Sequence, residues 1–549
     1  MKSLFAVISI VASSASLFAA PSITRSGIVN AANYTAPSLP GGSIAQGSLF
    51  TIFGAGLGPT PYAVASAFPL PTSLGGVSVK VQVTGKTLDA IPVFVSDTQI
   101  NAILPSGTPV GNALISVVYN GGTSTPQNIR VVNSSVGLFS IAGSGVGPSI
   151  LQNYTTTGLP VNARSVPAQP GQTVILYGTG LGAALNADNV NPQAGDLPQK
   201  VEIFVGGKLA AKSYSGRSPC CSGLDQYAFV IPADAALGCN VPLQVRTNGN
   251  VPSNVVSLSI SSDGKACTDS VQPFGAVTSG GNSGIVLLLR SNLQISFGGM
   301  TVGVTRDSLN ATFRNEKGGD FAFNPVLSPP PHGSCTEYNS RGNIFASWEL
   351  PGFAPSGRVL SAGTLSTFNG KKTVTAGLNG GEYQGDLGLI LPVPFNSPGG
   401  FLDAPSVTVI GGGGADVGAF TATAGAVPEI QWTNASGGPF DRAADLTVNW
   451  TIPGSTADRT VIIAGGNADL FANTSGFFLC TATASANTFT VPSSVLERLT
   501  PSRSGSRGTQ GAILVGLIGD RPQAPLAATG ISGGALNRAT LAGGLAEFK

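Results

Sequence analysis

The sequence predicts an all-β protein, with tandem immunoglobulin-like β-sandwiches followed by a larger C-terminal β-sandwich region. Three observations favour this fold class. Turn-forming residues are frequent, because the 549 residues include 75 Gly and 39 Pro. Charged residues make up only 10% of the chain, too few for the Lys- and Glu-rich surfaces of many exposed helices. Short β-branched segments lie between the turns, which is typical of antiparallel sandwiches.

The composition also argues against several classes of function. A hydrophobic content of 42% and a net charge of +2 argue against disorder and against a nucleic-acid partner. The single histidine, His332, argues against most zinc sites and allows at most one Ser-His-Asp or Cys-His arrangement. We therefore expect a protein that is not an enzyme and that needs no cofactor.

The chain begins like an exported protein. A lysine at position 2 precedes an uncharged stretch from Leu4 to Leu17, and small residues follow at Ala19 and Ala20. This pattern predicts a signal peptide over residues 1–20, cleaved after Ala19 or Ala20. No later stretch is long and apolar enough to span a bilayer, so we expect a soluble mature chain, secreted or at the cell surface.

An internal repeat follows the leader. The segment Gln46–Gly58 returns as Pro170–Gly182, and Gln99–Pro105 returns as Gln226–Pro232 with a similar offset. Two copies of one unit explain this, and they divide the chain into repeat 1 over 21–137, repeat 2 over 138–268 and a C-terminal region over 269–549. In that last region one large or two small sandwiches are expected.

The strands of repeat 1 can be placed from its pattern. Residues Val77–Val83 alternate apolar and polar side chains, the signature of a strand with one buried face. The remaining strands are expected at Leu49–Phe53, Ile100–Leu104, Leu114–Tyr119 and Ile129–Val132. Gly54, Gly56 and Gly58 follow the first of these strands and are interpreted as turn residues, since no helix pattern follows them.

Several motifs of the repeats are recognisable. The segment after Gly47 resembles the opening strand of IPT/TIG immunoglobulin-like domains, and residues 21–268 resemble uncharacterised secreted β-domains of acidobacterial (Solibacter-type) proteins. The motifs that carry this resemblance are Val29–Tyr34, Leu70–Val77, Val95–Asn101, Gly137–Phe139 and Gly143–Pro148. The resemblance implies Ig-like sandwiches outside the cytoplasm, and it implies no catalytic residue and no ligand.

The C-terminal region continues the β pattern without the repeat. Strands are expected at Gly284–Arg290, Ser406–Ile410, Leu446–Thr451, Thr460–Ala464 and Thr488–Val491. Residues 491–499 are the best candidate for a short helix, with Ser493 as a candidate N-cap. The run Gly411–Gly414 is expected to form a flexible loop.

Six cysteines suit an oxidising compartment. Cys239 starts one expected strand and Cys267 follows the next, so antiparallel pairing favours a Cys239–Cys267 disulfide. Cys335 and Cys480 are assigned to a second bridge within the C-terminal region. The adjacent Cys220 and Cys221 remain as a third pair.

Candidate sites are few. His332 follows a proline run and is expected on a surface loop, without a catalytic role. A glycoside hydrolase needs only two carboxylates, and the candidates in the C-terminal region are Glu337, Glu349, Glu382 and Asp416. The oxygen-rich segment Asn186–Asn191, with Asp196 beyond it, offers ligands of the kind calcium prefers, although it lacks the spacing of an EF-hand loop.

Three tryptophans are candidates for stacking on a sugar. Trp450 shares a strand face with Val448 and Leu446, so core packing is expected for it. Trp432 has polar neighbours and is the better candidate, and Trp348 is the third.

The leading hypothesis is a non-catalytic secreted or cell-surface protein that acts in adhesion or extracellular binding, with a protein or a polysaccharide as ligand. One alternative is an extracellular glycoside hydrolase that uses a carboxylate pair in the C-terminal region. The other is a purely structural surface spacer.

Overall fold

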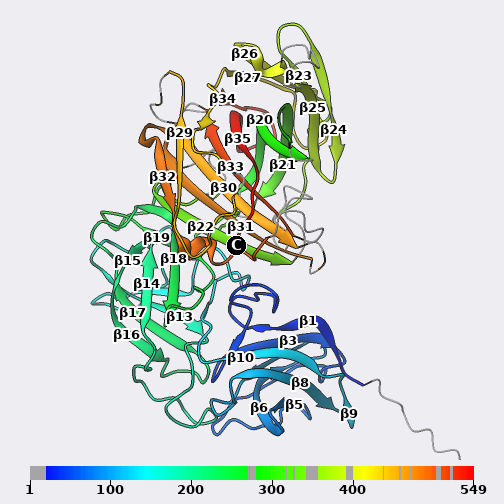
Figure 1. Cartoon of the computed structure of the whole chain (residues 1–549). Coiled ribbons are helices and arrows are strands. Elements are labelled where there is room, and N and C mark those ends of the chain that lie inside the picture. Colours follow the sequence, from blue (N-terminus) through cyan, green and yellow to red (C-terminus); the bar gives the residue numbers. More distant parts are fainter. Residues whose placement is uncertain are drawn as a thin grey trace, which may run out of the picture.

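The structure is a computed structural model. It describes residues 20–269, 271, 280–297, 300–316, 318–325, 328–341, 357–390, 400–436, 438–454, 456, 459–469, 471, 473–502, 509–519 and 524–549. The predicted leader up to residue 19, Trp348 and Glu349 lie outside the described residues. Within them the fold is all-β, as the sequence predicts, and the single α-helix, α1, is Ser493–Leu496 (Figure 1).

The first unit is a ten-stranded assembly in the order β1-β3-β7-β6-β5-β8-β10-β2, with β4 on β6 and β9 on β8. Its strands are β1 (Ser22–Asn30), β2 (Ile44–Ala45), β3 (Leu49–Ala55), β4 (Ala63–Val64), β5 (Ser78–Val83), β6 (Lys86–Val95), β7 (Gln99–Ile103), β8 (Gly111–Tyr119), β9 (Gly122–Thr123) and β10 (Gln127–Val132). The alternation expected for β5 is present, since Val79, Val81 and Val83 are buried. Strand β6 pairs with β5 through one half and with β7 through the other, which joins the two layers around one core.

The second unit has two separate sheets, β11-β13-β17-β16 and β15-β14-β18-β19, with β12 paired to β13. Its strands are β11 (Gly137–Leu138), β12 (Leu151–Asn153), β13 (Thr173–Thr179), β14 (Val201–Val205), β15 (Lys208–Leu209), β16 (Ala211–Arg217), β17 (Asp225–Val230), β18 (Gly238–Thr247) and β19 (Val256–Ile260). The repeated motifs occupy equivalent places, because β13 pairs antiparallel with β17 as β3 does with β7.

The C-terminal region contains a thirteen-stranded sheet in the order β22-β31-β30-β33-β35-β20-β21-β25-β24-β23-β26-β27, with β34 on β35, and a three-stranded sheet β28-β29-β32. Its strands are β20 (Gly281–Phe297), β21 (Met300–Glu316), β22 (Ser334–Arg341), β23 (Leu365–Phe368), β24 (Thr373–Asn379), β25 (Glu382–Ile390), β26 (Ser406–Gly411), β27 (Phe420–Gly425), β28 (Gln431–Trp432), β29 (Leu446–Thr451), β30 (Thr460–Asp469), β31 (Thr474–Thr483), β32 (Thr488–Val491), β33 (Thr509–Ile518), β34 (Ala524–Pro525) and β35 (Gly533–Leu545). Two hydrophobic clusters pack against it, one around Phe313 and Tyr383, the other around Trp450 and Phe478.

The short helix corrects one detail of the sequence prediction. Ser493 is the first helical residue and not the N-cap, a position that Pro492 holds. The backbone N–H of Ser493 donates instead to the carboxylate of Asp445 at 2.8 Å. A side chain from the start of β29 therefore satisfies a donor that the prediction assigned to the helix's own serine.

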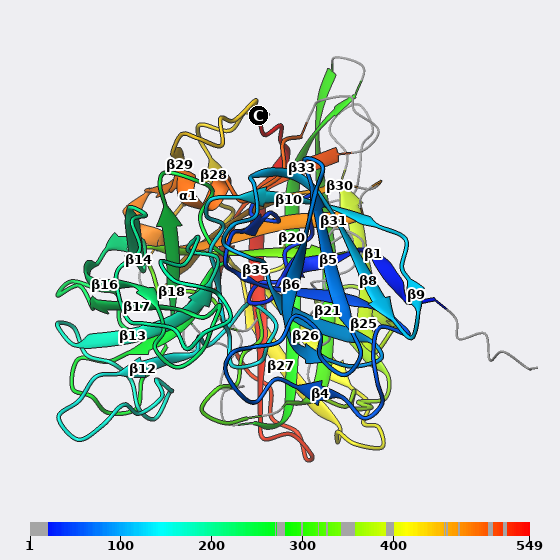
Figure 2. The ribbon, with the colours of Figure 1, turned by 90° about the horizontal axis from the view of Figure 1, so that it is seen from below.

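In Figure 1 the C-terminal region lies above both Ig-like units, and Figure 2 shows those two units side by side. Arg217 of β16 connects the units, because its guanidinium donates to Asp225 within the second unit and to the backbone oxygen of Gly47 in the first at 2.9 Å. Both charged side chains are at most 5% exposed. The two units are thus joined through a buried, hydrogen-bonded ion pair.

A second buried arginine connects all three parts. The Nε of Arg498, just after α1, donates to Glu337 at 2.9 Å, and both side chains are 1% exposed. Its Nη1 donates to the oxygens of Pro40 in the first unit, at 2.9 Å, and of Pro252 in the second, at 3.3 Å. One guanidinium therefore contacts the first unit, the second unit and the C-terminal region.

Candidate functional site

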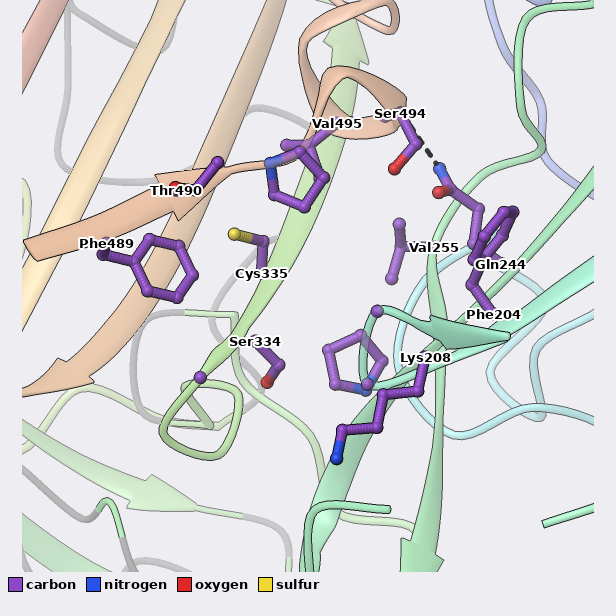
Figure 3. A pocket seen from close by; sticks show the side chains of 15 residues that line it. Phe204, Lys208, Gln244, Val255, Ser334, Cys335, Phe489, Thr490, Ser494 and Val495 are labelled. Atoms are coloured by element: carbon purple, nitrogen blue, oxygen red, sulfur yellow. Dashed lines mark hydrogen bonds between the residues drawn. The ribbon is translucent and has the colours of Figure 1, made fainter. Parts of the chain in front are cut away.

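A cleft of about 190 Å³ lies between the second unit and the C-terminal region (Figure 3). Neither part forms it alone, so its shape depends on how the two are joined. The residues that line it are Phe204, Gly206, Gly207, Lys208, Pro242, Gln244, Val255, Gly333, Ser334, Cys335, Phe489, Thr490, Pro492, Ser494 and Val495.

The wall from the second unit is the hairpin of β14 and β15. Val205 pairs with Lys208, so Gly206 and Gly207 form a two-residue turn. Both have positive φ, 57° and 82°, as this tight hairpin turn requires, and glycine adopts such angles without steric cost. The turn leaves Phe204 half-buried at the cleft and places Lys208 at its exposed rim.

The opposite wall is strand β32 with the helix that follows it. Among the described strands, β32 is at the edge of its sheet and pairs with β29 alone. It contributes Phe489, which is half-buried against the core, and Thr490, which is exposed. Figure 3 shows Phe489 and Phe204 at opposite ends of the cleft, one from each wall.

The two walls also contact each other at the cleft. The buried Gln244 of β18 donates through Nε2 to the oxygen of Ser253 at 3.1 Å and, at 3.5 Å, to that of Ser494 in α1. Nearby, Arg246 of the same strand forms an ion pair with Glu497 at 2.6 Å. Burial raises the pKa of Glu497, and the adjacent arginine partly offsets this rise. These contacts hold the cleft open at a defined width.

The cleft carries almost no net charge. Lys208 is the one ionisable side chain of the lining, and its ammonium pairs with the exposed carboxylate of Asp234. The hydrogen bond from Lys208 lowers the pKa of Asp234, which keeps that carboxylate ionised over the neutral range. The other polar groups at the lining are hydroxyls, one amide and backbone atoms.

The floor of the cleft belongs to the turn that carries the only histidine. Gly333, Ser334 and Cys335 line the cleft, whereas His332 does not. His332 lies in the turn as expected, but it is half-buried and not on the open surface, with its Nε2 at 3.0 Å from the hydroxyl of Thr460. The disulfide between Cys335 and Cys480 ties this turn to β31.

Of the candidate carboxylates that the structure describes, Glu337 and Asp416 are each paired with an arginine. Glu337 lies in β22 and forms the buried ion pair with Arg498. Asp416 is held by Arg358 and by the backbone N–H of Ser361, each at 2.8 Å. These hydrogen bonds lower the pKa of Asp416. Glu382 begins β25, which pairs with β21 and β24 and is separated from β22 by several strands of the sheet.

The candidate calcium segment belongs to the joint between the Ig-like units. The carboxylate of Asp188 accepts hydrogen bonds from the backbone N–H and the hydroxyl of Ser106, at 2.7 and 2.6 Å. The backbone oxygen of Asn189 accepts from Leu70 of the first unit at 2.7 Å. Asp196 accepts from the backbone of Ser215 at 2.6 Å. These oxygens therefore already accept hydrogen bonds from groups of the protein itself.

The two tryptophans that the structure describes, Trp432 and Trp450, both contact the core. Trp450 is 1% exposed and its indole N–H donates to the oxygen of Ala484, as core packing requires. Trp432 pairs directly with Trp450 across β28 and β29, so it lies on the same face and packs against the core. Trp432 is half-buried, and its indole N–H donates to the side-chain oxygen of Asn434 at 2.8 Å. That Trp432 stacks on a sugar stays a prediction.

Three disulfides are present, joining Cys220 to Cys221, Cys239 to Cys267 and Cys335 to Cys480. Cys220 and Cys221 are exposed in the turn between β16 and β17. In the same turn, Gly223 packs against Leu49 of the first unit. This turn therefore belongs to the joint between the two Ig-like units.

Sequence reasoning missed the residues that line the cleft. Phe204 and Phe489 are ordinary strand residues in the printed sequence, and nothing local relates them. Two signals were available but unused: the glycine pair at 206–207, which is typical of a hairpin turn, and the Thr-x-Thr pattern at 488–490, which is typical of an exposed strand face. Neither pattern reveals that the two elements lie opposite each other.

Comparison with known proteins identifies part of the first unit. Residues 36–131 match the IPT/TIG domain family. This match confirms the Ig-like interpretation of the first repeat. No curated protein matches the chain.

Several solved structures resemble parts of the chain. The plexin A4 extracellular region is 12% identical with a TM-score of 0.16, covering 43% of this chain and 18% of that chain. Titin Ig tandem domains are 11% identical with a TM-score of 0.13, covering 40% and 91%. SGBP-B from a xyloglucan utilization locus in Bacteroides uniformis is 13% identical with a TM-score of 0.15, covering 70% and 92%. These values carry no argument about function.

The structure also bears on membrane insertion. Across the described part of the chain, no helix has the length and apolar character required to cross a bilayer.

Proposed function

We propose that this chain is an exported, non-catalytic binding protein that acts in adhesion or in the capture of an extracellular polymer, either a polysaccharide or a protein. The observation that carries the proposal is the cleft between the second unit and the C-terminal region. It combines two aromatic side chains with uncharged polar groups, the usual lining of a binding pocket.

The joints around the cleft support a binding role. Arg498 contacts all three parts of the molecule, and Arg246 with Glu497 links the two walls. Both walls are therefore positioned before a ligand arrives. Preorganisation of this kind favours binding, because less conformational entropy is lost when the complex forms.

The location outside the cytoplasm has separate support. Three disulfides are typical of proteins that fold in an oxidising compartment, and the leader pattern directs export. The resemblance of residues 21–268 to secreted acidobacterial β-domains, which we retain as part of this proposal, is compatible with the same location.

The test is a binding screen with the purified protein against immobilised extracellular polysaccharides and matrix proteins. We expect retention on at least one polymer, without its cleavage. Thr490→Trp fills the cleft from an exposed strand position and should abolish retention. The matched control, Thr421→Trp on the exposed face of β27, should leave it unchanged. Equal retention of both variants, or release of cleaved polymer, contradicts the proposal.

A further inference from the structure

We infer that the cleft binds a neutral polysaccharide, with one sugar ring inside it and the following rings over the outward face of β29 and β32. This inference rests on the proposed function and specifies its ligand. Three features of the described residues lead to it: the charge of the lining, the position of its aromatic rings, and the side chains that continue the surface beyond the cleft.

The charge of the lining favours a neutral ligand. Of the lining residues only Lys208 ionises, and Asp234 already neutralises it. An acidic sugar or a phosphate needs an unpaired cation, usually arginine, to replace its hydration. A basic peptide needs unpaired carboxylates, which the lining does not contain. An uncharged ligand loses the least solvation free energy on entering this site.

The aromatic rings favour a ligand with apolar faces and polar edges. Phe489 and Phe204 lie at opposite ends of the cleft, while Thr490, Ser494 and Gln244 lie between or beside them (Figure 3). A pyranose ring presents C–H groups on its faces and hydroxyls around its edge. Its faces can therefore pack on the phenyl rings while its hydroxyls bond the polar side chains.

The size of the cleft limits how much of the ligand it holds. Its 190 Å³ is below the roughly 300–1,000 Å³ of pockets that enclose a drug-sized molecule. A single ring fits this volume better than an oligosaccharide does. A longer chain must therefore continue outside the cleft.

The surface that continues from the cleft is an ordered array of hydroxyl and amide groups. Thr490 lies at the cleft and is paired with Thr447 of β29, their hydroxyl oxygens 3.3 Å apart. The next pair is Thr488 and Asn449, where the threonine hydroxyl donates to the amide oxygen at 2.7 Å. Every outward side chain of these two strands is uncharged, including Thr451.

This array suits a hydroxylated polymer. Cross-strand pairing fixes the positions of the hydroxyls, so little side-chain entropy remains to be lost on binding. The methyl groups of the threonines add apolar contact between the hydroxyls. A polysaccharide that leaves the cleft past Thr490 meets alternating polar and apolar groups, which match its own surface.

The experiment is isothermal titration calorimetry of the purified protein with defined hexasaccharides. The neutral probes are cellohexaose, xylohexaose, mannohexaose and maltohexaose, and the acidic probe is a hexamer of galacturonic acid. We expect at least one neutral hexamer to bind, with an affinity that does not change with salt. The acidic hexamer should bind more weakly, because its charge has no partner in the lining.

Two variants locate the binding. Thr490→Glu puts a charge where the polysaccharide leaves the cleft. It should weaken the affinity for the neutral hexamer by about tenfold or more. Phe489→Leu keeps the apolar packing against the core but removes the ring, and should also weaken binding. The matched control, Thr421→Glu on β27, should bind as the unchanged protein does. Melting temperatures identify any variant that is unfolded.

The outcomes separate this inference from the proposed function. If Thr490→Glu binds the neutral hexamer normally, or if the acidic hexamer binds best and is released by salt, the inference is wrong. If no hexamer binds but a matrix protein is retained and is lost in Thr490→Trp, the ligand class is wrong and the proposed function stands. If the polymer screen also finds no ligand, both are wrong.

Discussion

Arg498 is the residue that most affects how the parts of the molecule are joined. Its guanidinium is 1% exposed and bonds Glu337 together with two backbone oxygens from the Ig-like units. Transferring a charged group from water to the protein interior costs free energy. The ion pair offsets this cost only if the remaining N–H donors of the arginine are also hydrogen-bonded. The oxygens of Pro40 and Pro252 accept these bonds from Nη1, so this donor of Arg498 is bonded to both Ig-like units only when all three parts are in place.

The pH dependence of stability follows from Glu337. Burial raises the pKa of this carboxyl above its usual 4.5, and Arg498 opposes the rise. The folded state therefore binds the proton more tightly than the unfolded state does. The contribution of Glu337 to the free energy of unfolding should fall as the pH increases from about 4.5 through the folded-state pKa, and stay constant above it.

Urea unfolding at a series of pH values measures this dependence, with Glu337→Gln as the comparison. The amide of the variant does not titrate, so its stability should lack the decline with increasing pH that Glu337 contributes. The free energy of unfolding of the unchanged protein minus that of the variant should therefore be largest at acid pH, below the usual pKa of the carboxyl, and smaller at neutral pH. A difference in the free energy of unfolding that is the same at every pH contradicts the raised pKa of Glu337.

Among the elements, β22 depends most on a covalent link. Within the part of the chain that the structure describes, it is at the edge of the thirteen-stranded sheet and pairs with β31, where Cys335 lies opposite Cys480. The bridge closes a long loop, because the two cysteines are 145 residues apart in sequence. It also holds the turn that forms the floor of the cleft.

Replacing both cysteines, Cys335→Ala with Cys480→Ala, should lower the free energy of unfolding by about 2–5 kcal/mol, because the unfolded chain gains conformational freedom. Denaturant unfolding measures the change. The same double replacement at Cys220 and Cys221, which closes almost no loop, is the control and should cost much less. Equal losses for the two pairs contradict this account.

The strands were more predictable than the segments around them. Strands β29 and β32 have the predicted bounds, because alternation of apolar and polar residues is a local signal. The run Gly411–Gly414 was interpreted as a flexible loop, yet Gly412 donates to Thr364 and Gly414 to Val417 in a close-packed turn. Its glycines allow backbone to approach backbone, which composition alone does not indicate.

For the whole molecule, the joint at Arg217 sets how the two Ig-like units lie. The guanidinium bonds Asp225 in its own unit and Gly47 in the other, and Asp225 also accepts from the backbone of Leu181 at 2.7 Å. The planar guanidinium of Arg217 donates to several acceptors at once. A lysine ammonium does not reproduce this geometry. The two units should therefore move as one body.

Arg217→Lys should loosen this joint while each unit stays folded. Small-angle X-ray scattering should show a larger radius of gyration and a broader distribution of distances than the unchanged protein gives. Circular dichroism should retain the β spectrum. The matched control is Lys212→Arg in the same strand, which should leave the scattering curve unchanged. If Arg217→Lys gives the same scattering curve as the unchanged protein, the guanidinium of Arg217 has no role in holding the two units together.

The sequence by itself determined the all-β class, the repeat and the positions of many strands, since turn residues, alternation and motif spacing are properties of neighbouring residues. Only the tertiary structure decided that Trp432 faces the core, that Asp445 caps the helix and that Phe204 lies across a cleft from Phe489. These facts depend on contacts between segments far apart in the chain. Such contacts are set by how sheets pack and where charges are buried, and no local pattern encodes them.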